Sequence, residues 1–267
     1  MAMEKIENNT QKLLEITKEL FKKISPFYDE RANRHDQYEA FPIAPIPEIG
    51  LDEWIFSKLS SFFKNHPYYT EVKTLDGFKI YTYDVFSVEE SKTWKKYDEI
   101  SAPTWLLSVL NLIERLKLLG SGPVVDIGAH DGRFPCVAKC KGLDGLGIEI
   151  NPNLIRAQEE VAKTTETKLK VYQADGKKFD YANLDVSKPT FVIIGFSFTD
   201  DILKRIYATS LDIIDESLFL VLDEPKYLEK PKGYSWENIQ SVKLPNYWFP
   251  YGHTTYSIAR LRRKSIV

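Results

Sequence analysis

Residues 124–134 read VVDIGAHDGRF, and this stretch decides the fold class. Its first four residues form a short, mostly apolar run typical of a buried strand, and a helical pattern begins at Arg133. Gly128 and Gly132 lie in the connection, where glycine allows a sharp turn and a close approach of the backbone to a ligand. The free N–H groups at the start of the helix would point at the same place. We therefore predict a strand, a tight loop and a helix, arranged like a turn that binds a nucleoside cofactor.

The same alternation of strands and helices continues along the chain. Strands are predicted at 124–127, 146–150, 169–173, 191–196 and 218–222, with helices at 133–141, 153–163 and 200–215. Strands separated by helices imply right-handed crossovers. The last two runs, 239–244 and 254–261, have a short connection and should pair as a hairpin at one edge. We therefore predict an α/β fold with a doubly wound, mainly parallel seven-strand sheet that ends in an antiparallel C-terminal hairpin.

The first hundred residues follow a different pattern. Apolar spacing predicts a helix over 3–24 that ends before Pro26, and a second helix over 51–64. Residues 69–86 read as a hairpin that turns at Asp76 and Gly77. We expect residues 1–100 to be an N-terminal helical and hairpin extension, acting as a substrate lid or an interaction region. A helix over 103–119 then leads into the main domain, residues 101–267.

Three consecutive strand ends carry groups that suit one ligand. In a doubly wound sheet the ligand lies beyond the carboxyl ends of the strands, where the strand order reverses. Glu149 follows Asp126 by 23 positions and ends the second strand, where a carboxylate can accept hydrogen bonds from both hydroxyls of a ribose. Asp175, with Gly176, follows the third strand, where a carboxylate can accept a hydrogen bond from the exocyclic amine of an adenine. The predicted ligand is therefore a nucleoside.

Three stretches between residues 123 and 198 read, in order, VVDIGAHDGRF, GLGIEINPNLI and YQADGKKF. This region resembles the class I, Rossmann-like S-adenosylmethionine-dependent methyltransferases. The resemblance implies that S-adenosyl-L-methionine is the cofactor and that residues 101–267 are the methyltransferase domain. It implies that Gly128 and the neighbouring backbone hold the methionine part, Glu149 the ribose hydroxyls and Asp175 the adenine amine. The cofactor-binding residues expected in full are Asp126, Gly128, Ala129, Gly132, Glu149, Ile150, Asp175 and Gly176.

Two residues of the first loop leave alternatives open. Asp126 lies inside the strand, so fixing the backbone of the loop is as good a role for it as contact with a ligand. His130 stands where the family usually has its middle glycine. It is either a neighbour of the methionine carboxylate or a turn residue that faces solvent, and we favour the turn residue.

A methyltransferase needs few catalytic side chains, because transfer from a sulfonium is a direct displacement that requires alignment and exclusion of water. We assign no catalytic residue. The fourth strand ends near Ser197 and Phe198, which together with Tyr97 and Thr104 are candidates for the substrate pocket. The Asn or Asp followed by Pro-Pro and an aromatic residue, common in enzymes that methylate base amino groups, is absent from this point. The acceptor is therefore expected to be a protein lysine or a small-molecule hydroxyl.

A second and weaker resemblance supports the lysine acceptor. Asp131-Gly132-Arg133, taken with Glu149 to Pro152 and with Ala102-Pro103-Thr104, is similar to a group of small protein-lysine methyltransferases. Two other classes of function stay open. A non-catalytic scaffold could keep the cofactor loop, with the extension as its interaction surface. A nicotinamide-dependent oxidoreductase would use the same fold region, but its G-x-G-x-x-G motif is here G-x-x-x-G.

The amino-acid composition limits the classes of partner that the protein is expected to bind. The chain has 267 residues, and 36 Lys and Arg nearly offset 38 Asp and Glu, which leaves a formal net charge of −2. This balance disfavours nucleic acid and membranes as partners, so we expect a small-molecule or protein methyl acceptor. No apolar run approaches the roughly 18 residues of a membrane span, and the start lacks a signal-peptide core, so we expect a cytoplasmic protein. Cys136, Cys140 and four scattered histidines make no metal site, and the oligomeric state stays undetermined.

Overall fold

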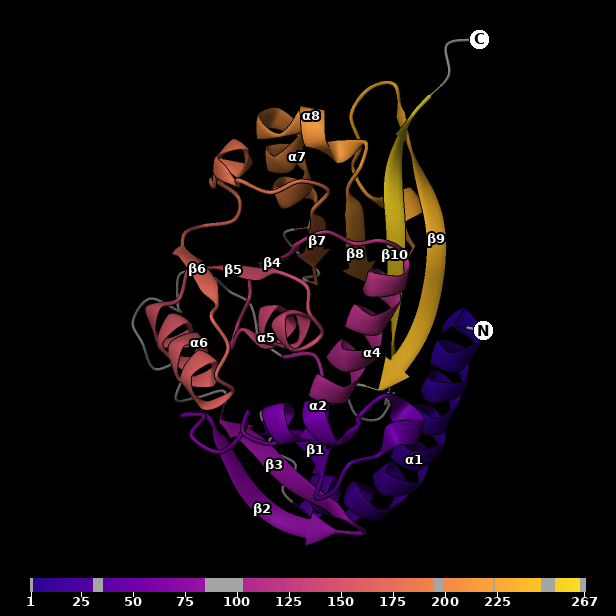
Figure 1. Ribbon diagram of the computed structural model, residues 1–267, viewed down its shortest axis with the longest axis vertical. Coiled ribbons are helices and arrows are strands. Elements are labelled where there is room, and N and C mark those ends of the chain that lie inside the picture. Colours follow the sequence, from indigo (N-terminus) through magenta and orange to yellow (C-terminus); the bar gives the residue numbers. More distant parts are fainter. Residues whose placement is uncertain are drawn as a thin grey trace.

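The computed structural model describes residues 2–30, 36–84, 103–194, 199–222, 224–245 and 253–264. Its larger sheet has seven strands (Figure 1). These strands are β4 (Val124–Ile127), β5 (Gly145–Glu149), β6 (Lys170–Gln173), β7 (Thr190–Ile193), β8 (Leu218–Leu222), β9 (Tyr234–Pro245) and β10 (His253–Arg263). Their spatial order is β6-β5-β4-β7-β8-β10-β9.

The strand directions confirm the predicted fold class. The five strands from β4 to β8 pair in parallel, whereas β10 is antiparallel to both β8 and β9. Strand order reverses at β4, which lies between β5 and β7. The carboxyl ends of β4, β5 and β7 therefore border the place where an open α/β sheet binds its ligand.

Helices cover both faces of this sheet, which explains its short apolar strands. One face packs against α4 (Leu106–Leu118), α5 (Arg133–Cys140) and α6 (Pro152–Thr164), and the other against α7 (Thr199–Thr209) and α8 (Leu211–Ile214). Successive residues Val124 and Val125 belong to the two opposite hydrophobic clusters. The single helix expected over 200–215 is thus divided into α7 and α8. Cys136 and Cys140 are buried free thiols on α5.

The N-terminal part forms a second, three-stranded antiparallel sheet. Its strand order is β1 (Asp36–Pro42), β3 (Phe78–Asp84), β2 (Tyr69–Leu75), and it is accompanied by α1 (Ala2–Glu30) and α2 (Glu53–Leu59). The predicted hairpin is confirmed and is formed by β2 and β3. The sequence did not predict β1, because residues 38–41 are all buried and so lack the alternation typical of a strand with one exposed face. Short 3-10 turns lie at Pro47–Ile49, Tyr181–Asn183 and Pro225–Tyr227.

The first helix is longer than predicted. We expected it to end before Pro26, but α1 continues to Glu30. A proline removes one backbone N–H donor from a helix and strains the turn before it, yet tertiary contacts can outweigh this local cost. The stripe formed by Leu13, Leu20 and Ile24 is buried in the main hydrophobic cluster. Packing of this stripe stabilises the helix along most of its length.

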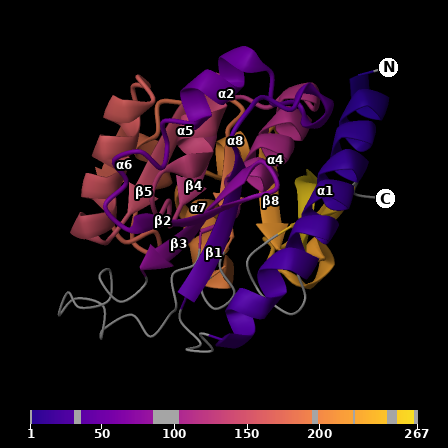
Figure 2. The same cartoon turned by 90° about the horizontal axis from the view of Figure 1, so that it is seen from below.

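The extension and the larger domain share one hydrophobic core. Ile55 and Phe62 from the N-terminal part belong to the same cluster as Leu107 of α4 and Phe134 of α5. The N-terminal sheet lies in front of β4, β5 and α5 when the molecule is seen from below (Figure 2). Among the described residues, no helix combines the length and the apolar character that a membrane crossing needs.

Candidate functional site

The loop after β4 is fastened to the neighbouring strand. The N–H groups of Gly128 and Ala129 both donate to the carbonyl oxygen of Ile148, at 2.9 and 3.1 Å. Gly128 is exposed and has a φ of 76°, whereas Ala129 is buried. Because these two N–H groups are engaged within the protein, a ligand at this loop would meet the exposed backbone of Gly128 through other groups, such as its carbonyl oxygen.

Glu149 is the central carboxylate of the site. One oxygen accepts the N–H groups of Ile150 and Asn151, each at 2.8 Å, and the other accepts the N–H group of His130 at 2.9 Å. The residue is only 6% exposed. Burial raises the pKa of Glu149, and the three backbone hydrogen bonds act in the opposite direction by favouring the carboxylate. Glu149 thus joins the end of β5 to the loop after β4.

Asp175 lies beyond the next strand end and is more accessible. Its Oδ1 accepts the N–H of Lys177 at 2.9 Å, and its Oδ2 lies 3.4 Å from the exposed ammonium of Lys178. The N–H of Ala174 donates to the carbonyl of Glu149 at 2.9 Å, which holds this strand end beside β5. Asp175 therefore supports a turn and still presents a partly exposed carboxylate oxygen to a ligand.

Three other expected cofactor residues have clear structural roles. A Cβ on Gly132, whose φ is 79°, would lie 2.9 Å from the side chain of Gln158. A Cβ on Gly176 would lie 2.7 Å from Ile127, so only glycine fits against the end of β4. Ile150 is partly buried and reaches Glu149 through its N–H group.

Asp126 is a buried carboxyl within β4, paired with Gly147 and Val192 of the flanking strands. Burial raises its pKa well above the ordinary value, and the negative charges of Asp131 and Glu149 add to this effect. The side chain is thereby biased toward its neutral form. A neutral carboxyl can donate one hydrogen bond as well as accept others.

A buried polar cluster that the sequence did not predict lies beside this loop. Arg133 donates to both oxygens of Asp131, at 2.9 and 2.6 Å, and to Glu39 of β1 at 2.9 Å. Its other partners are the hydroxyl of Tyr69, at 2.6 Å, and the carbonyl oxygen of Thr104. Burial acts to raise the pKa of Asp131, but the charge of Arg133 and its hydrogen bonds hold that pKa well below the ordinary value.

His66 closes the cluster on its N-terminal side. Its Nδ1 accepts the N–H of Tyr68 at 3.2 Å, so the proton of the neutral ring is on Nε2, which lies 3.4 Å from Asp131. Burial lowers the pKa of His66 because it disfavours the charged imidazole. The sequence singled out Asp131, Arg133 and Thr104 as parts of a resemblance, but it gave no signal that Glu39, His66 and Tyr69 of the extension would join them.

The predicted substrate residues are only partly placed. Tyr97, Ser197 and Phe198 lie outside the described residues. Thr104 is buried just before α4, where its backbone carbonyl contacts Arg133, so it belongs to the junction between the extension and the domain. Of the aromatic residues in the extension, Phe62, Phe63, Tyr81 and Tyr83 are buried in the core, whereas Trp54 is 56% exposed.

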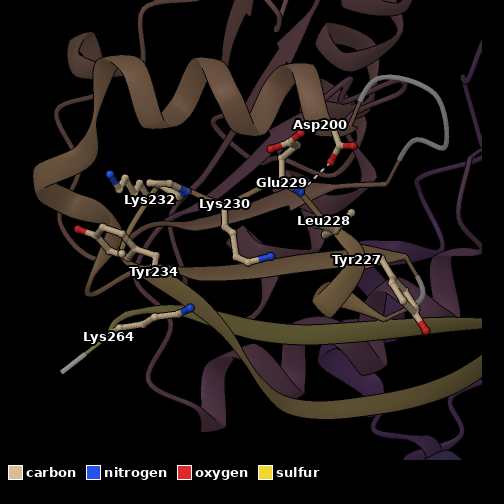
Figure 3. A pocket seen from close by; sticks show the side chains of 10 residues that line it. Asp200, Tyr227, Leu228, Glu229, Lys230, Lys232, Tyr234 and Lys264 are labelled. Carbon is tan, nitrogen blue, oxygen red and sulfur yellow. Dashed lines mark hydrogen bonds between the residues drawn. The ribbon is translucent and has the colours of Figure 1, made fainter. Parts of the chain in front are cut away.

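An open hollow of about 450 Å³ lies between the start of α7 and the segment that leads into β9 (Figure 3). Its lining includes Asp200, Tyr227, Glu229, Lys230, Lys232 and Lys264. None of the residues predicted for the cofactor site lines it. Within the described ranges, the buried side-chain atoms that lack a hydrogen-bond partner belong to His66, His130, Gln158 and Gln240, all outside this lining. The hollow is therefore separate from the candidate site.

No protein-family model matches the chain, and no curated protein matches it. Solved structures with a similar general fold include an RNA methyltransferase from Salinibacter ruber in complex with S-adenosyl-L-homocysteine. It shares 19% sequence identity with this chain at a TM-score of 0.42, and the match covers 58% of this chain and 93% of that one. A tRNA (uracil-54, C5)-methyltransferase from Pyrococcus abyssi with the same ligand has 15% identity and a TM-score of 0.42, covering 58% of this chain and 38% of that one. The 23S rRNA methyltransferase ErmE has 17% identity and a TM-score of 0.42, covering 59% and 68%. This chain spans well under half the length of the tRNA enzyme, and the fold assignment rests on the strand order and directions.

These structures correct one expectation. The sequence disfavoured nucleic acid as a partner on the grounds of its net charge and of the missing motif after the fourth strand. RNA methyltransferases nevertheless occur among the proteins with this general fold, so the exclusion was wrong. Net charge is a poor guide because nucleic-acid contacts depend on the local distribution of basic groups. The missing motif concerns only acceptors that are base amino groups, so its absence does not exclude other positions in a nucleic acid.

Proposed function

We propose that this protein is an S-adenosyl-L-methionine-dependent methyltransferase that binds its cofactor across the carboxyl ends of β4, β5 and β6. The observation that carries the proposal is the position of Glu149. Its carboxylate ends β5, next to β4 where the strand order reverses, and accepts a hydrogen bond from the His130 N–H of the glycine loop. Its backbone carbonyl is bonded to Ala174, next to Asp175. The three parts of the site are thus joined through one residue.

The residues present fit the cofactor. A carboxylate has about four acceptor positions, and backbone N–H groups take three of those of Glu149, which leaves one for a ribose hydroxyl. The sequence predicts hydrogen bonds from both ribose hydroxyls to Glu149, so with one acceptor position left the second hydroxyl would need another partner. At the next strand end, Asp175 can accept the adenine amine, because the side chain facing its Oδ2 is an exposed lysine that water can replace.

The cofactor supplies a methyl group bound to a sulfonium. The chain's own residues would hold the nucleoside through Glu149 and Asp175, hold the methionine part at the exposed backbone of Gly128, and keep water from the reacting centre. We further propose that residues 1–100 select the acceptor as part of a substrate pocket that includes Tyr97, Thr104, Ser197 and Phe198. The contacts of Glu39, His66 and Tyr83 with the loop region support this role, because they place the extension at the same edge of the sheet.

Calorimetry with the purified full chain tests the cofactor. We expect S-adenosyl-L-homocysteine to bind with a stoichiometry of one, and NAD⁺ to show no binding. Binding of NAD⁺ in place of S-adenosyl-L-homocysteine would instead support an oxidoreductase, because both cofactors use this edge of the sheet.

Turnover tests the enzyme and identifies its acceptor. The protein is incubated with S-adenosylmethionine labelled in its methyl group and with separate RNA, protein and small-molecule fractions. Label should enter one fraction. If that fraction is RNA or protein, ribonuclease or protease respectively should convert the label to a soluble form. Stoichiometric cofactor binding without label in any fraction would support the scaffold alternative.

A further inference from the structure

His130 adopts an unusual backbone conformation. Its φ is 49°, in the left-handed region, and it lies between Gly128 and Gly132, whose φ values are 76° and 79°. For a residue with a side chain this conformation costs about 1 to 2 kcal/mol relative to the ordinary helical region. Glycine would adopt it without this cost. A histidine at this position therefore requires compensating contacts.

Hydrogen bonds hold His130 at three points. Its N–H donates to Glu149 at 2.9 Å, and its carbonyl oxygen accepts the side-chain amide of Gln158 at 2.9 Å. Its ring Nε2 is 2.8 Å from the hydroxyl of Tyr83. The first two contacts come from the same α/β domain, whereas Tyr83 lies on β3 of the N-terminal sheet. The imidazole ring is therefore the point where the extension reaches the cofactor loop.

Tyr83 is itself rigidly placed. It is 1% exposed, and β3 is the central strand of its sheet, with Tyr83 opposite Tyr69 in β2. The rings of His66, Tyr68 and Tyr69 surround it, with centroids 5.0 to 6.5 Å away. Burial raises the pKa of Tyr83 well above its ordinary value, so the phenol keeps its proton and can donate to the imidazole.

We propose that Tyr83 is a positioning residue of the cofactor site, acting through His130 on Glu149. This inference rests on the proposed function. The phenol fixes the imidazole, the fixed ring stabilises the left-handed backbone of residue 130, and that backbone aims its N–H at one oxygen of Glu149. The direction of the remaining acceptor position, and hence the ribose contact, then depends on the extension. A family position usually held by glycine is thus filled by a histidine that the extension anchors.

A purely structural role would make a different prediction. If the Tyr83 hydroxyl only stabilised the packing of the extension on the domain, its removal would lower the stability of the protein and leave the cofactor affinity of the folded protein unchanged. The two roles separate in a double-mutant cycle, because glycine at position 130 removes both the imidazole and the need to anchor it.

The experiment measures S-adenosyl-L-homocysteine affinity by calorimetry for the full-length wild type, Tyr83→Phe, His130→Gly and the double variant. Tyr81→Phe is the matched control, since Tyr81 lies on the same strand and stacks on Phe63, 4.3 Å away. Tyr83→Phe should weaken binding about 3- to 10-fold, the equivalent of one lost hydrogen bond. In the His130→Gly background the same change should alter affinity less than about 2-fold. Tyr81→Phe should bind like the wild type.

Each result has a distinct meaning. Equal affinity of Tyr83→Phe and wild type overturns the inference and leaves the proposed function intact. An equal loss in both backgrounds also overturns it, because the hydroxyl would then act without His130. Absence of binding by the wild type itself overturns the proposed function, and this inference with it. Circular dichroism and thermal unfolding of each variant confirm that affinities are compared between folded proteins.

Discussion

Glu39 and Arg133 form a buried ion pair at 2.9 Å, although 94 positions separate them in the chain. Their side chains are 3% and 2% exposed. Glu39 also accepts a hydrogen bond from the N–H of Leu106, the first residue of α4. The N-cap residue of this helix, Trp105, makes no capping hydrogen bond with its side chain. One carboxylate from the extension therefore joins Asp131 in pairing with the guanidinium at the start of α5, and it also caps α4. The extension is thereby fastened to the domain by a polar contact as well as by the shared core.

Replacement of Glu39 should lower the free energy of unfolding. Glu39→Ala leaves Arg133 with one buried carboxylate partner and α4 without its cap, so the free energy of unfolding should fall by about 3 to 5 kcal/mol. Urea denaturation measures this change. Glu48→Ala removes an exposed carboxylate from the same part of the chain and should cost less than about 0.5 kcal/mol. Equal effects of the two variants would show that the buried pair does not stabilise the fold.

Glu149→Gln should weaken the binding of S-adenosyl-L-homocysteine by about 1 to 3 kcal/mol. The amide nitrogen of glutamine cannot accept the N–H groups that now reach both carboxylate oxygens, so the loop and the ribose contact are both disturbed. Calorimetry gives the affinity, and Glu159→Gln, at an exposed position of α6, is the control. Unchanged affinity in a folded Glu149→Gln protein would remove this residue from the cofactor site.

The titration of Asp126 should lower the free energy of unfolding as the pH rises. Burial and the charges of Asp131 and Glu149 raise its pKa in the folded state, so the folded protein favours the protonated carboxyl. Below the ordinary pKa of 3.8 the group is protonated in both states and its contribution is fully present. Above that pH the unfolded chain ionises first, and the contribution is lost as the pH climbs toward the folded-state pKa.

Asp126→Asn tests this titration, because asparagine cannot ionise. The stability of the variant relative to the wild type should increase between pH 4 and pH 7, as determined from urea denaturation at each pH. Asp185→Asn, which removes an exposed carboxylate, serves as the control. A difference between Asp126→Asn and wild type that stays constant or shrinks over this range would contradict the prediction.

Gly132→Ala should destabilise the protein more than Gly120→Ala. Both glycines have a positive φ, 79° and 75°, so each substitution carries a backbone cost of about 1 to 2 kcal/mol. A Cβ at position 132 would also press on Gln158 at 2.9 Å, whereas the described residues leave open space around position 120. Thermal and urea unfolding should show a further loss of about 1 kcal/mol or more for Gly132→Ala. Similar losses would mean that Gln158 moves aside at no cost.

Much of the larger domain could be predicted because its signals are local. The run VVDI coincides with β4 and residues 218–222 with β8, since strands covered on both faces read as short apolar segments. The glycine loop and the acidic residues at 149 and 175 were identified by their register with those strands. Predictions were weaker in the extension, where tertiary packing carried α1 past Pro26 and where β1 had no alternation to reveal it.

The sequence by itself determined the doubly wound sheet and the positions of Gly128, Glu149 and Asp175 at its strand ends, because periodicity and strand order follow from neighbouring residues. Only the tertiary structure decided how the extension meets this edge. The contact of Tyr83 with His130 spans 47 positions and that of Glu39 with Arg133 spans 94. A buried hydrogen bond between distant segments leaves no periodic pattern, because each partner alone resembles an ordinary core tyrosine, a turn histidine or a surface charge. Its existence depends on folding having brought both groups out of water together.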